Sequence, residues 1–257
     1  MSSSDDAVLS TGDLQGRVAL VTGAGRNVGA GIATALAAAG AAVAVNDLHL
    51  ERAEDTAAAI RAGGGRAIAA AADVCRPDAI AEMIDHVTRT LGPVDCLVNN
   101  AGVPDDGGVP LQHFRDMPVE HWDRYLDLNL RAVLRCTKAV LDGMCERGFG
   151  RVVTIVSEAG RLGLPPGLTL YAAGKAGAAG FSRVLAHEVG RHGVTVNCVS
   201  LGPMENAVRR EQVVKAMPMR RYGTPADAGA AVVYLCSPGA SWVTGQTLAL
   251  NGGYFTT

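Results

Sequence analysis

The chain has 257 residues, of which 48% are hydrophobic and 19% are charged, and its formal net charge is −2. This amount of apolar material supplies the core of one α/β domain, or of two small ones at most. A nearly balanced charge argues against the basic surface of a nucleic-acid-binding protein.

The first residues, MSSSDDAVLSTGD, are polar and acidic and lack the charged and apolar regions of a secretory signal. We expect residues 1–13 to form a flexible tail. No run reaches the roughly 18 apolar residues that a membrane span needs. Six cysteines are scattered, without a C-x-x-C pair or a His/Cys cluster at metal-ligand spacing. These features predict a cytoplasmic, reduced protein with buried free thiols and no structural metal.

From residue 17 onward, short apolar runs alternate with longer amphipathic stretches. We expect strands at 17–22, 42–46, 66–74, 94–99, 151–157, 194–200 and 247–250. Helices are expected at 31–40, 49–62, 77–91, in long patterns over 111–147, at 170–190 and near 225–236. Strict alternation with continuously apolar strands predicts a parallel sheet that is covered by helices on both faces. No repeat or linker divides the chain, so we predict one domain over residues 14–257.

Sheets of this class bind ligands at the carboxyl ends of their strands. The first strand leads into VTGAGRNVGAGIA, in which glycines 23, 25, 29 and 31 precede or open a helix. Backbone N–H groups and a helix dipole can hold a pyrophosphate in that setting. Glycine turns without a phosphate are also common, and Val28 replaces the third glycine of the usual G-x-G-x-x-G motif. The turn alone therefore leaves both interpretations open.

Acidic and amide side chains follow the next three strands. Asp47 lies 24 residues beyond Gly23, where a carboxylate can accept hydrogen bonds from both hydroxyls of an adenosine ribose. It is also placed to cap the next helix. Asp73 suits either the adenine amino group or a cap. Asn99 and Asn100 tolerate the unusual backbone angles of a tight turn.

Tyr171 and Lys175 are separated by two alanines and a glycine. Residues four apart share one face of a helix, so the phenol and the ammonium would lie one turn apart. Such a pair is either ordinary helix surface or an acid–base device, and the pair by itself does not decide between them.

Ordered motifs over residues 14–257 together resemble the short-chain dehydrogenase/reductase family. The resemblance implies a single-domain, Rossmann-type, doubly wound parallel sheet of about seven strands. The closing segment VTGQTLALNGGY also resembles the last strand of the family. The matched positions are Thr22, Gly23 and Gly29 for the T-G-x-x-x-G-x-G turn, residues 99–102 for N-N-A-G, Asn129 and Ser157 for the segments that carry the catalytic asparagine and serine, and Tyr171 and Lys175 for Y-x-x-x-K.

The resemblance gives four residues catalytic roles. Tyr171 would take a proton from an alcohol or give one to a ketone. Tyrosine has an ordinary pKa of about 10, and a nearby Lys175 and the positive charge of an oxidised nicotinamide would lower it. Lys175 would also bond the nicotinamide ribose. Ser157 would hold the substrate oxygen, and Asn129 would anchor a water that connects Lys175 to solvent.

The resemblance also implies a nicotinamide dinucleotide cofactor and a homotetramer. We expect NAD rather than NADP, because the 2′-phosphate of NADP would meet the Asp47 carboxylate. Residue 48 is leucine rather than arginine, so Arg26 in the glycine turn is the cation that could offset this repulsion. The residues expected in the cofactor cleft are Gly23, Gly25, Arg26, Asn27, Val28, Gly29, Asp47, Asp73, Val74, Asn100, Ala101, Gly102, Tyr171, Lys175, Gly202 and Met204.

Four positions depart from the family pattern. The second glycine of the turn is Asn27, a residue type that visits left-handed backbone angles. Gly174 stands where the family often has serine, and we expect the glycine to be tolerated there. Leu201 replaces the proline of a Pro-Gly pair, and Asn206 replaces a threonine that helps to hold the nicotinamide carboxamide.

The substrate is less well indicated. Residues 202–223, the expected substrate lid, carry a local excess of three positive charges. This segment would either dock an anionic carrier, such as coenzyme A or acyl carrier protein, or form a solvated helix face or a subunit contact. The segment SEAGRLGLPPGL adds Glu158 and Arg161 beside Ser157 and is one residue longer than in many relatives, so this proline-stiffened insert would reshape the pocket wall. The charged residues of the lid are Arg209, Arg210, Lys215, Arg220 and Arg221 against Glu205 and Glu211.

We therefore predict an NAD-dependent oxidoreductase that interconverts a secondary alcohol and a ketone, with a 3-oxoacyl thioester as one possible substrate. The alternative is a dinucleotide-binding regulator that has kept the fold without the chemistry. Sugar epimerases and dehydratases of related fold are a weaker enzymatic alternative, because they are usually longer and use another glycine spacing.

Overall fold

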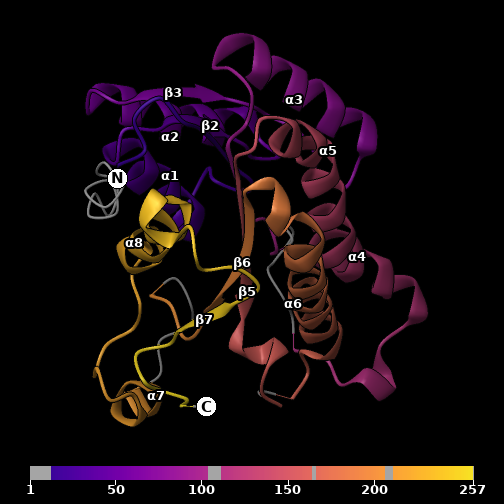
Figure 1. Ribbon diagram of the computed structural model, residues 1–257. Coiled ribbons are helices and arrows are strands. Elements are labelled where there is room, and N and C mark those ends of the chain that lie inside the picture. Colours follow the sequence, from indigo (N-terminus) through magenta and orange to yellow (C-terminus); the bar gives the residue numbers. More distant parts are fainter. Residues whose placement is uncertain (1–12, 104–110, 164–165, 206–210, 257) are drawn as a thin grey trace.

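In the computed structural model, the chain is described over residues 13–103, 111–163, 166–205 and 211–256. A seven-stranded sheet lies at its centre, in the order β3-β2-β1-β4-β5-β6-β7 (Figure 1). Every pair of neighbouring strands is parallel. The strands are β1 (Val18–Val21), β2 (Ala42–Val45), β3 (Arg66–Ala69), β4 (Cys96–Asn99), β5 (Gly150–Ser157), β6 (Val194–Leu201) and β7 (Thr247–Leu250).

Helices cover both faces of the sheet (Figure 1). One face shares a hydrophobic core with α1 (Asn27–Ala38), α2 (Leu50–Ala62) and α8 (Pro225–Cys236). The other face packs against α3 (Pro77–Thr90), α5 (Ala132–Glu146) and α6 (Thr169–Val189). The short helices α4 (Trp122–Leu126) and α7 (Glu211–Ala216) complete the described helices of the α type.

The two cores explain why β1 and β2 are apolar at every position. In β1, Ala19 and Val21 belong to the core with α1 and α8, whereas Val18 and Leu20 belong to the core with α3 and α5. Successive side chains of a strand point to opposite faces, so both sets are buried. The predicted doubly wound α/β fold is confirmed.

Two segments differ from the sequence-based expectation. The strand expected at 66–74 ends at Ala69, where the side-chain amide of Asn46 donates to the carbonyl oxygens of Ala70 and Ala72. The helical pattern expected over 111–147 is interrupted. Two 3₁₀ turns at Phe114–Asp116 and Val119–His121 precede α4, and a π-helical turn at Asp127–Arg131 separates α4 from α5.

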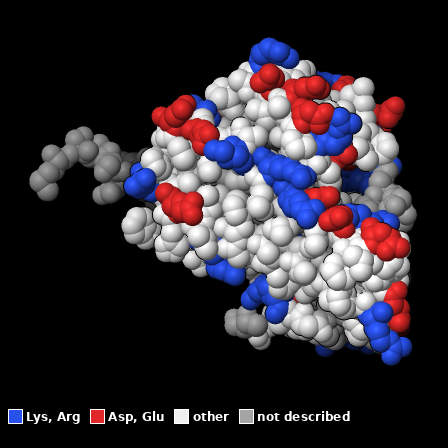
Figure 2. Space-filling view, turned by 90° about the vertical axis from the view of Figure 1, so that its right-hand side faces the viewer, with Lys and Arg blue, Asp and Glu red and all other residues white. Residues whose placement is uncertain are grey.

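Charged side chains of both signs are interspersed on the face seen in Figure 2, in keeping with the net charge of −2. Among the described helices, none is long and apolar enough to cross a membrane. The tail expected at residues 1–13 lies almost wholly outside the described residues, as does the middle of the expected lid, residues 206–210.

Candidate active site

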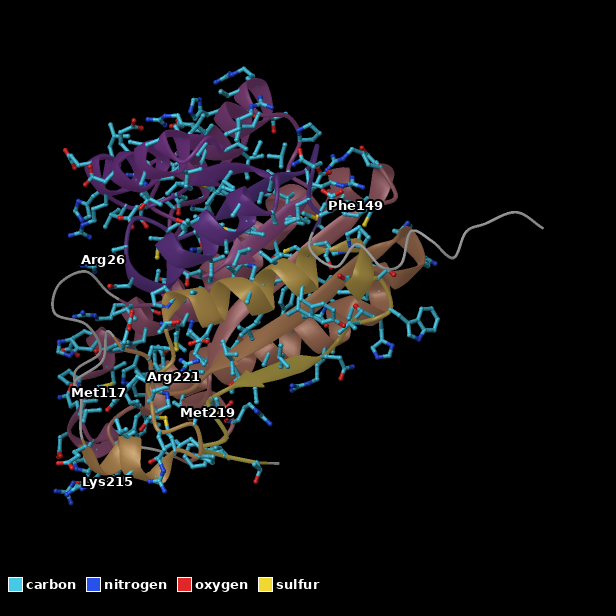
Figure 3. All side chains as sticks on the ribbon, turned by 90° about the vertical axis from the view of Figure 1, so that its left-hand side faces the viewer. Arg26, Met117, Phe149, Lys215, Met219 and Arg221 are labelled. Atoms are coloured by element: carbon cyan, nitrogen blue, oxygen red, sulfur yellow. The ribbon has the colours of Figure 1, made fainter. Side chains whose placement is uncertain are left out.

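A cavity of about 680 Å³ opens at the carboxyl ends of the central strands. Its wall contains the turn after β1, the residues that follow β2, β3 and β4, the end of β5, and Tyr171 and Lys175 of α6. Arg26 belongs to this wall, and Figure 3 shows it far from Phe149, which precedes β5 at the other end of the sheet. Parallel sheets of this topology bind their ligands at this edge.

The glycine turn after β1 is tightly tied to the end of β4. The side-chain amide of Asn100 donates to the carbonyl oxygens of Thr22 and Gly23, both at 2.9 Å. A Cβ at Gly29 would lie 2.2 Å from the Gly23 carbonyl oxygen, so only glycine fits there. Asn27 adopts the predicted left-handed conformation, with φ of 50°.

Gly31 has a different role from the one that the sequence indicated. A Cβ at this position would lie 2.3 Å from Cβ of Pro225, the first residue of α8. Gly31 therefore allows α1 and α8 to pack closely, and it is not among the described residues that line the cavity.

Asp47 both shapes the turn and faces the cavity. It is only 7% exposed. Its Oδ2 accepts a hydrogen bond from the Gly25 N–H, and its Oδ1 accepts one from the His49 N–H, each at 3.1 Å. Asp73 likewise accepts from the Cys75 N–H at 2.9 Å and lies in the cavity wall. These bonds are not helix caps, because the N-cap residues are His49 for α2 and Arg76 for α3, and neither helix has a side-chain cap. The capping interpretation is therefore wrong for both carboxylates, which instead fix the turns ahead of the helices and lie in the cavity wall.

The four expected catalytic residues converge from three elements. Ser157 ends β5, Tyr171 and Lys175 lie on α6, and Asn129 lies in the π-helical turn between α4 and α5. Ser157 and Tyr171 are joined by a hydrogen bond, and the Ser157 hydroxyl also accepts from the Ala159 N–H at 3.2 Å. The Lys175 ammonium lies 5.7 Å from the centre of the Tyr171 ring.

Asn129 is fully buried behind this group. Its Nδ2 donates to the Tyr125 carbonyl oxygen at 3.1 Å, whereas its Oδ1 has no partner among the described residues. A Cβ at Gly102 would lie 2.5 Å from Lys175 Nζ and 2.9 Å from Asn129 Oδ1. The oxygen and the ammonium therefore face the same point, and an unpartnered buried oxygen is suited to a bound water.

Burial dominates the acid–base properties of the site. It raises the pKa of Tyr171, and the hydrogen bond with Ser157 opposes that rise. Burial lowers the pKa of Lys175 to about 8, and the ammonium donates to the Ile155 carbonyl oxygen at 2.8 Å. The expectation that Lys175 lowers the pKa of Tyr171 is therefore not met in this structure, because desolvation of the phenol outweighs the other contributions.

Several of the departures now have a structural meaning. Glycine fits at position 174, because a Cβ there would lie 2.7 Å from Cβ of Asn129 and a serine would require movement. A Cβ at Gly202 would lie 2.7 Å from Cβ of Asn251, which explains why a glycine is kept after Leu201. Asn206 lies outside the described residues.

The basic lid segment is partly neutralised by its own ion pairs. Lys215 contacts Glu211 at 2.7 Å, and Arg221 makes two bonds to Asp227 at 2.6 and 2.9 Å. Arg209 and Arg210 lie outside the described residues.

Glu158 is likewise paired. It is 5% exposed, and its Oε1 lies 3.1 Å from Nη1 of Arg161. The charge that these two residues would bring to the pocket wall is therefore balanced within the pair.

Sequence reasoning missed part of the cavity wall. Arg52, Cys75, Arg124 and Asp127 all line it, although they belong to no motif. Arg52 follows Asp47 by five residues and lies in the first turn of α2, so helical spacing from the strand end was the one available signal.

Three comparisons with known proteins show what the whole chain is similar to. A family model described as "Enoyl-(Acyl carrier protein) reductase" matches residues 23–255. The chain is 39% identical over 246 residues to a 3-oxoacyl-[acyl-carrier-protein] reductase of Synechocystis sp., and the match covers 93% of this chain and 97% of that relative. It is 38% identical over 248 residues to nodulation protein G of Rhizobium meliloti, covering 94% and 98%. The crystal structure of a short-chain type dehydrogenase/reductase from Mycobacterium marinum superposes with a TM-score of 0.90 at 32% identity, and the match covers 100% of both chains.

Proposed function

Because the chain belongs to the short-chain dehydrogenase/reductase family, we propose that this oxidoreductase uses NAD to interconvert a secondary alcohol and a ketone. The observation that carries the proposal is that Ser157, Tyr171 and Lys175 line the same cavity as the glycine turn. A dinucleotide and a proton donor would meet in that cavity.

The residues present fit a nicotinamide dinucleotide. Gly23 and Gly29 pack against other parts of the protein so closely that no side chain fits there, and the turn also lines the cavity. Its backbone N–H groups and the N-terminus of α1 could hold a pyrophosphate. Asp47 would accept hydrogen bonds from the adenosine ribose. Asp73 and Val74 line the same cavity as Asp47. When bound, the nicotinamide ring accepts or supplies the hydride.

The chain's own residues supply the proton and the orientation. Tyr171 would exchange a proton with the substrate oxygen, which Ser157 would hold by a hydrogen bond. Lys175, close to the Tyr171 ring, would bond the nicotinamide ribose. Together with the positive charge of the oxidised nicotinamide it would oppose the burial that raises the pKa of Tyr171. Asn129 Oδ1 would hold a water next to the Lys175 ammonium, and that water would carry the proton toward solvent.

We propose a 3-oxoacyl thioester as the substrate class. The name of the Synechocystis relative and the basic residues of the lid support this choice. The ion pairs of Lys215 and Arg221 weaken it, since they reduce the free positive charge. If the lid docks an anionic carrier, the double substitution Arg209→Ala/Arg210→Ala should raise KM for thioesters and spare small ketones. Equal effects on both substrates would favour a solvated surface or a subunit contact.

The preference for NAD rests on Asp47. Its buried carboxylate would repel the doubly charged 2′-phosphate of NADP, which carries about −1.5 to −2 charges near neutral pH. Asp47→Ser should weaken NAD binding by about 1.5–3 kcal/mol and improve NADP binding. Equal affinity of the unmodified protein for the two cofactors would leave Asp47 with only its structural bonds to the N–H groups of Gly25 and His49.

A homotetramer is the proposed assembly. Trp242 is 97% exposed and Leu248 of the edge strand β7 is 41% exposed, so apolar surface is available for a subunit contact. Light scattering of the protein and of Trp242→Glu would test whether this surface holds subunits together.

The experiment that tests the central proposal is a panel of secondary alcohols, ketones and acyl thioesters, assayed by nicotinamide absorbance with NAD and with NADP. Turnover with one of these classes is the expected result. Cofactor binding without turnover of any of them would favour the regulator.

A further inference from the structure

The adenosine end of the cavity contains an arginine that no motif identifies. Arg52 lies in the first turn of α2 and lines the same wall as Arg26 and Asp47. We propose that Arg52 is a second determinant of cofactor choice: it supplies the positive charge for a 2′-phosphate, and the Asp47 carboxylate overrides it. This inference rests on the proposal that the cleft binds a nicotinamide dinucleotide.

Arg52 and Asp47 lie close to the same glycine of the turn. A Cβ at Gly25 would lie 2.6 Å from Cβ of Arg52 and 2.7 Å from Oδ2 of Asp47. Arg52 and Asp47 therefore flank the same glycine of the phosphate turn from the side of α2. A group on the ribose that reaches Asp47 is also within the reach of an arginine side chain that starts at this point.

The two arginines of the cavity wall, Arg26 and Arg52, differ in their exposure to solvent. Arg26 is exposed to solvent, whereas Arg52 is partly buried against the glycine turn. Charge interactions are weaker at an exposed site, because water screens them and an exposed side chain loses more freedom when it is fixed. Arg52 is thus the better placed of the two to hold a phosphate.

Loss of the Asp47 carboxylate would leave two backbone N–H donors without acceptors. Its two oxygens accept the N–H groups of Gly25 and His49. When a shorter side chain replaces Asp47, these two donors lose their acceptors in the part of the wall that Arg52 also lines. A phosphate monoester offers three acceptor oxygens and negative charge, which suits such a group of donors. The loss of one carboxylate would therefore convert a ribose site into a 2′-phosphate site.

Calorimetric titration with 2′,5′-ADP and 5′-AMP tests this without turnover. We expect Asp47→Ser to bind 2′,5′-ADP about tenfold more tightly, or better, than the unmodified protein. In the double variant Asp47→Ser/Arg52→Ala, that gain should disappear. Arg61→Ala in the same background is the matched control, because Arg61 lies on α2, is 42% exposed and pairs with Glu54. It should leave the gain intact.

The same titrations contain the outcomes that overturn the inference. A gain that survives Arg52→Ala but is lost in Asp47→Ser/Arg26→Ala would assign the phosphate to Arg26. If Asp47→Ser does not fold, Arg52→Ala alone should weaken 2′,5′-ADP binding several-fold more than 5′-AMP binding, and equal effects would refute the role. Failure of the unmodified protein to bind either NAD or 5′-AMP would instead refute the proposed function.

Discussion

Replacing Gly174 by alanine tests whether close contact between α6 and the π-helical turn positions Asn129. The added methyl group would lie 2.7 Å from Cβ of Asn129, closer than two carbon atoms approach without movement. Alanine stabilises a helix by about 1 kcal/mol relative to glycine. Overpacking of a well-packed site costs about 1–3 kcal/mol. The net expectation is a loss of about 0–2 kcal/mol in unfolding free energy.

The larger effect should be on catalysis. Asn129 Oδ1 and the Lys175 ammonium face the same point beside Gly102, so displacing Asn129 removes the acceptor of the proposed water. A misplacement of this kind reduces turnover by about tenfold to a hundredfold. Urea unfolding and steady-state kinetics would measure the two effects separately.

Gly180→Ala is the matched control on the same helix. Its Cβ would lie 3.9 Å from a guanidinium nitrogen of Arg183, an ordinary contact with a flexible side chain. This variant should gain about 1 kcal/mol in stability and keep its turnover. The reasoning would be refuted if Gly174→Ala showed the same gain in stability with turnover within twofold of the unmodified protein.

Three further changes test the site and its support. Tyr171→Phe removes the proton carrier and keeps the ring, so turnover should fall about 10²–10⁴-fold while calorimetry shows unchanged cofactor binding. Turnover within threefold of the unmodified protein would contradict the assignment. The pKa of Lys175 falls from 10.5 to about 8 on folding, so the unfolded state binds more protons in that window and stability should rise as pH increases from 8 to 10.5. Lys175→Met should lose this rise in urea unfolding, and an unchanged slope would count against the buried ammonium. Arg221 holds the pKa of Asp227 well below its usual range, so the stability from this carboxylate is present above about pH 4 and is lost as pH falls further. Asp227→Asn should lower the unfolding free energy by about 1 kcal/mol at pH 7, and much of this loss comes from the helix cap. The melting temperature of this variant should depend less on pH below about pH 4, and an equal acid sensitivity of both proteins would exclude this role.

The fold was largely predictable because its signal is repeated along the whole chain. Each apolar strand and each amphipathic helix supports the same parallel topology, and the expected helix at 225–236 coincides with α8. Side chains at strand ends were predictable for the same reason, since the topology brings them to one edge of the sheet. Asp47 and Ser157 could therefore be placed in the cavity wall from the sequence.

What the sequence did not reveal depends on contacts between distant segments. The fit of Gly174 against Asn129 and of Gly31 against Pro225 has no local signature, because a glycine in a helix looks the same whatever packs on it. The direction of the Tyr171 pKa depends on burial, which is a property of the whole structure. Arg52 was overlooked because only the folded glycine turn brings it beside Asp47.

The π-helical turn at Asp127–Arg131 has a consequence for the length of its segment. Each residue of an α-helix advances the chain by about 100°, and a π turn contains one residue more than the helical repeat requires. Deletion of one residue here would rotate α4 against α5 and turn Tyr125, now 4% exposed beside Met117 and Leu170, away from its core. A substitution at an exposed position of the turn would leave the packing of α4 against α5 in place, whereas a change of length would alter it. We therefore expect libraries of this enzyme to tolerate substitutions in the turn far better than insertions or deletions.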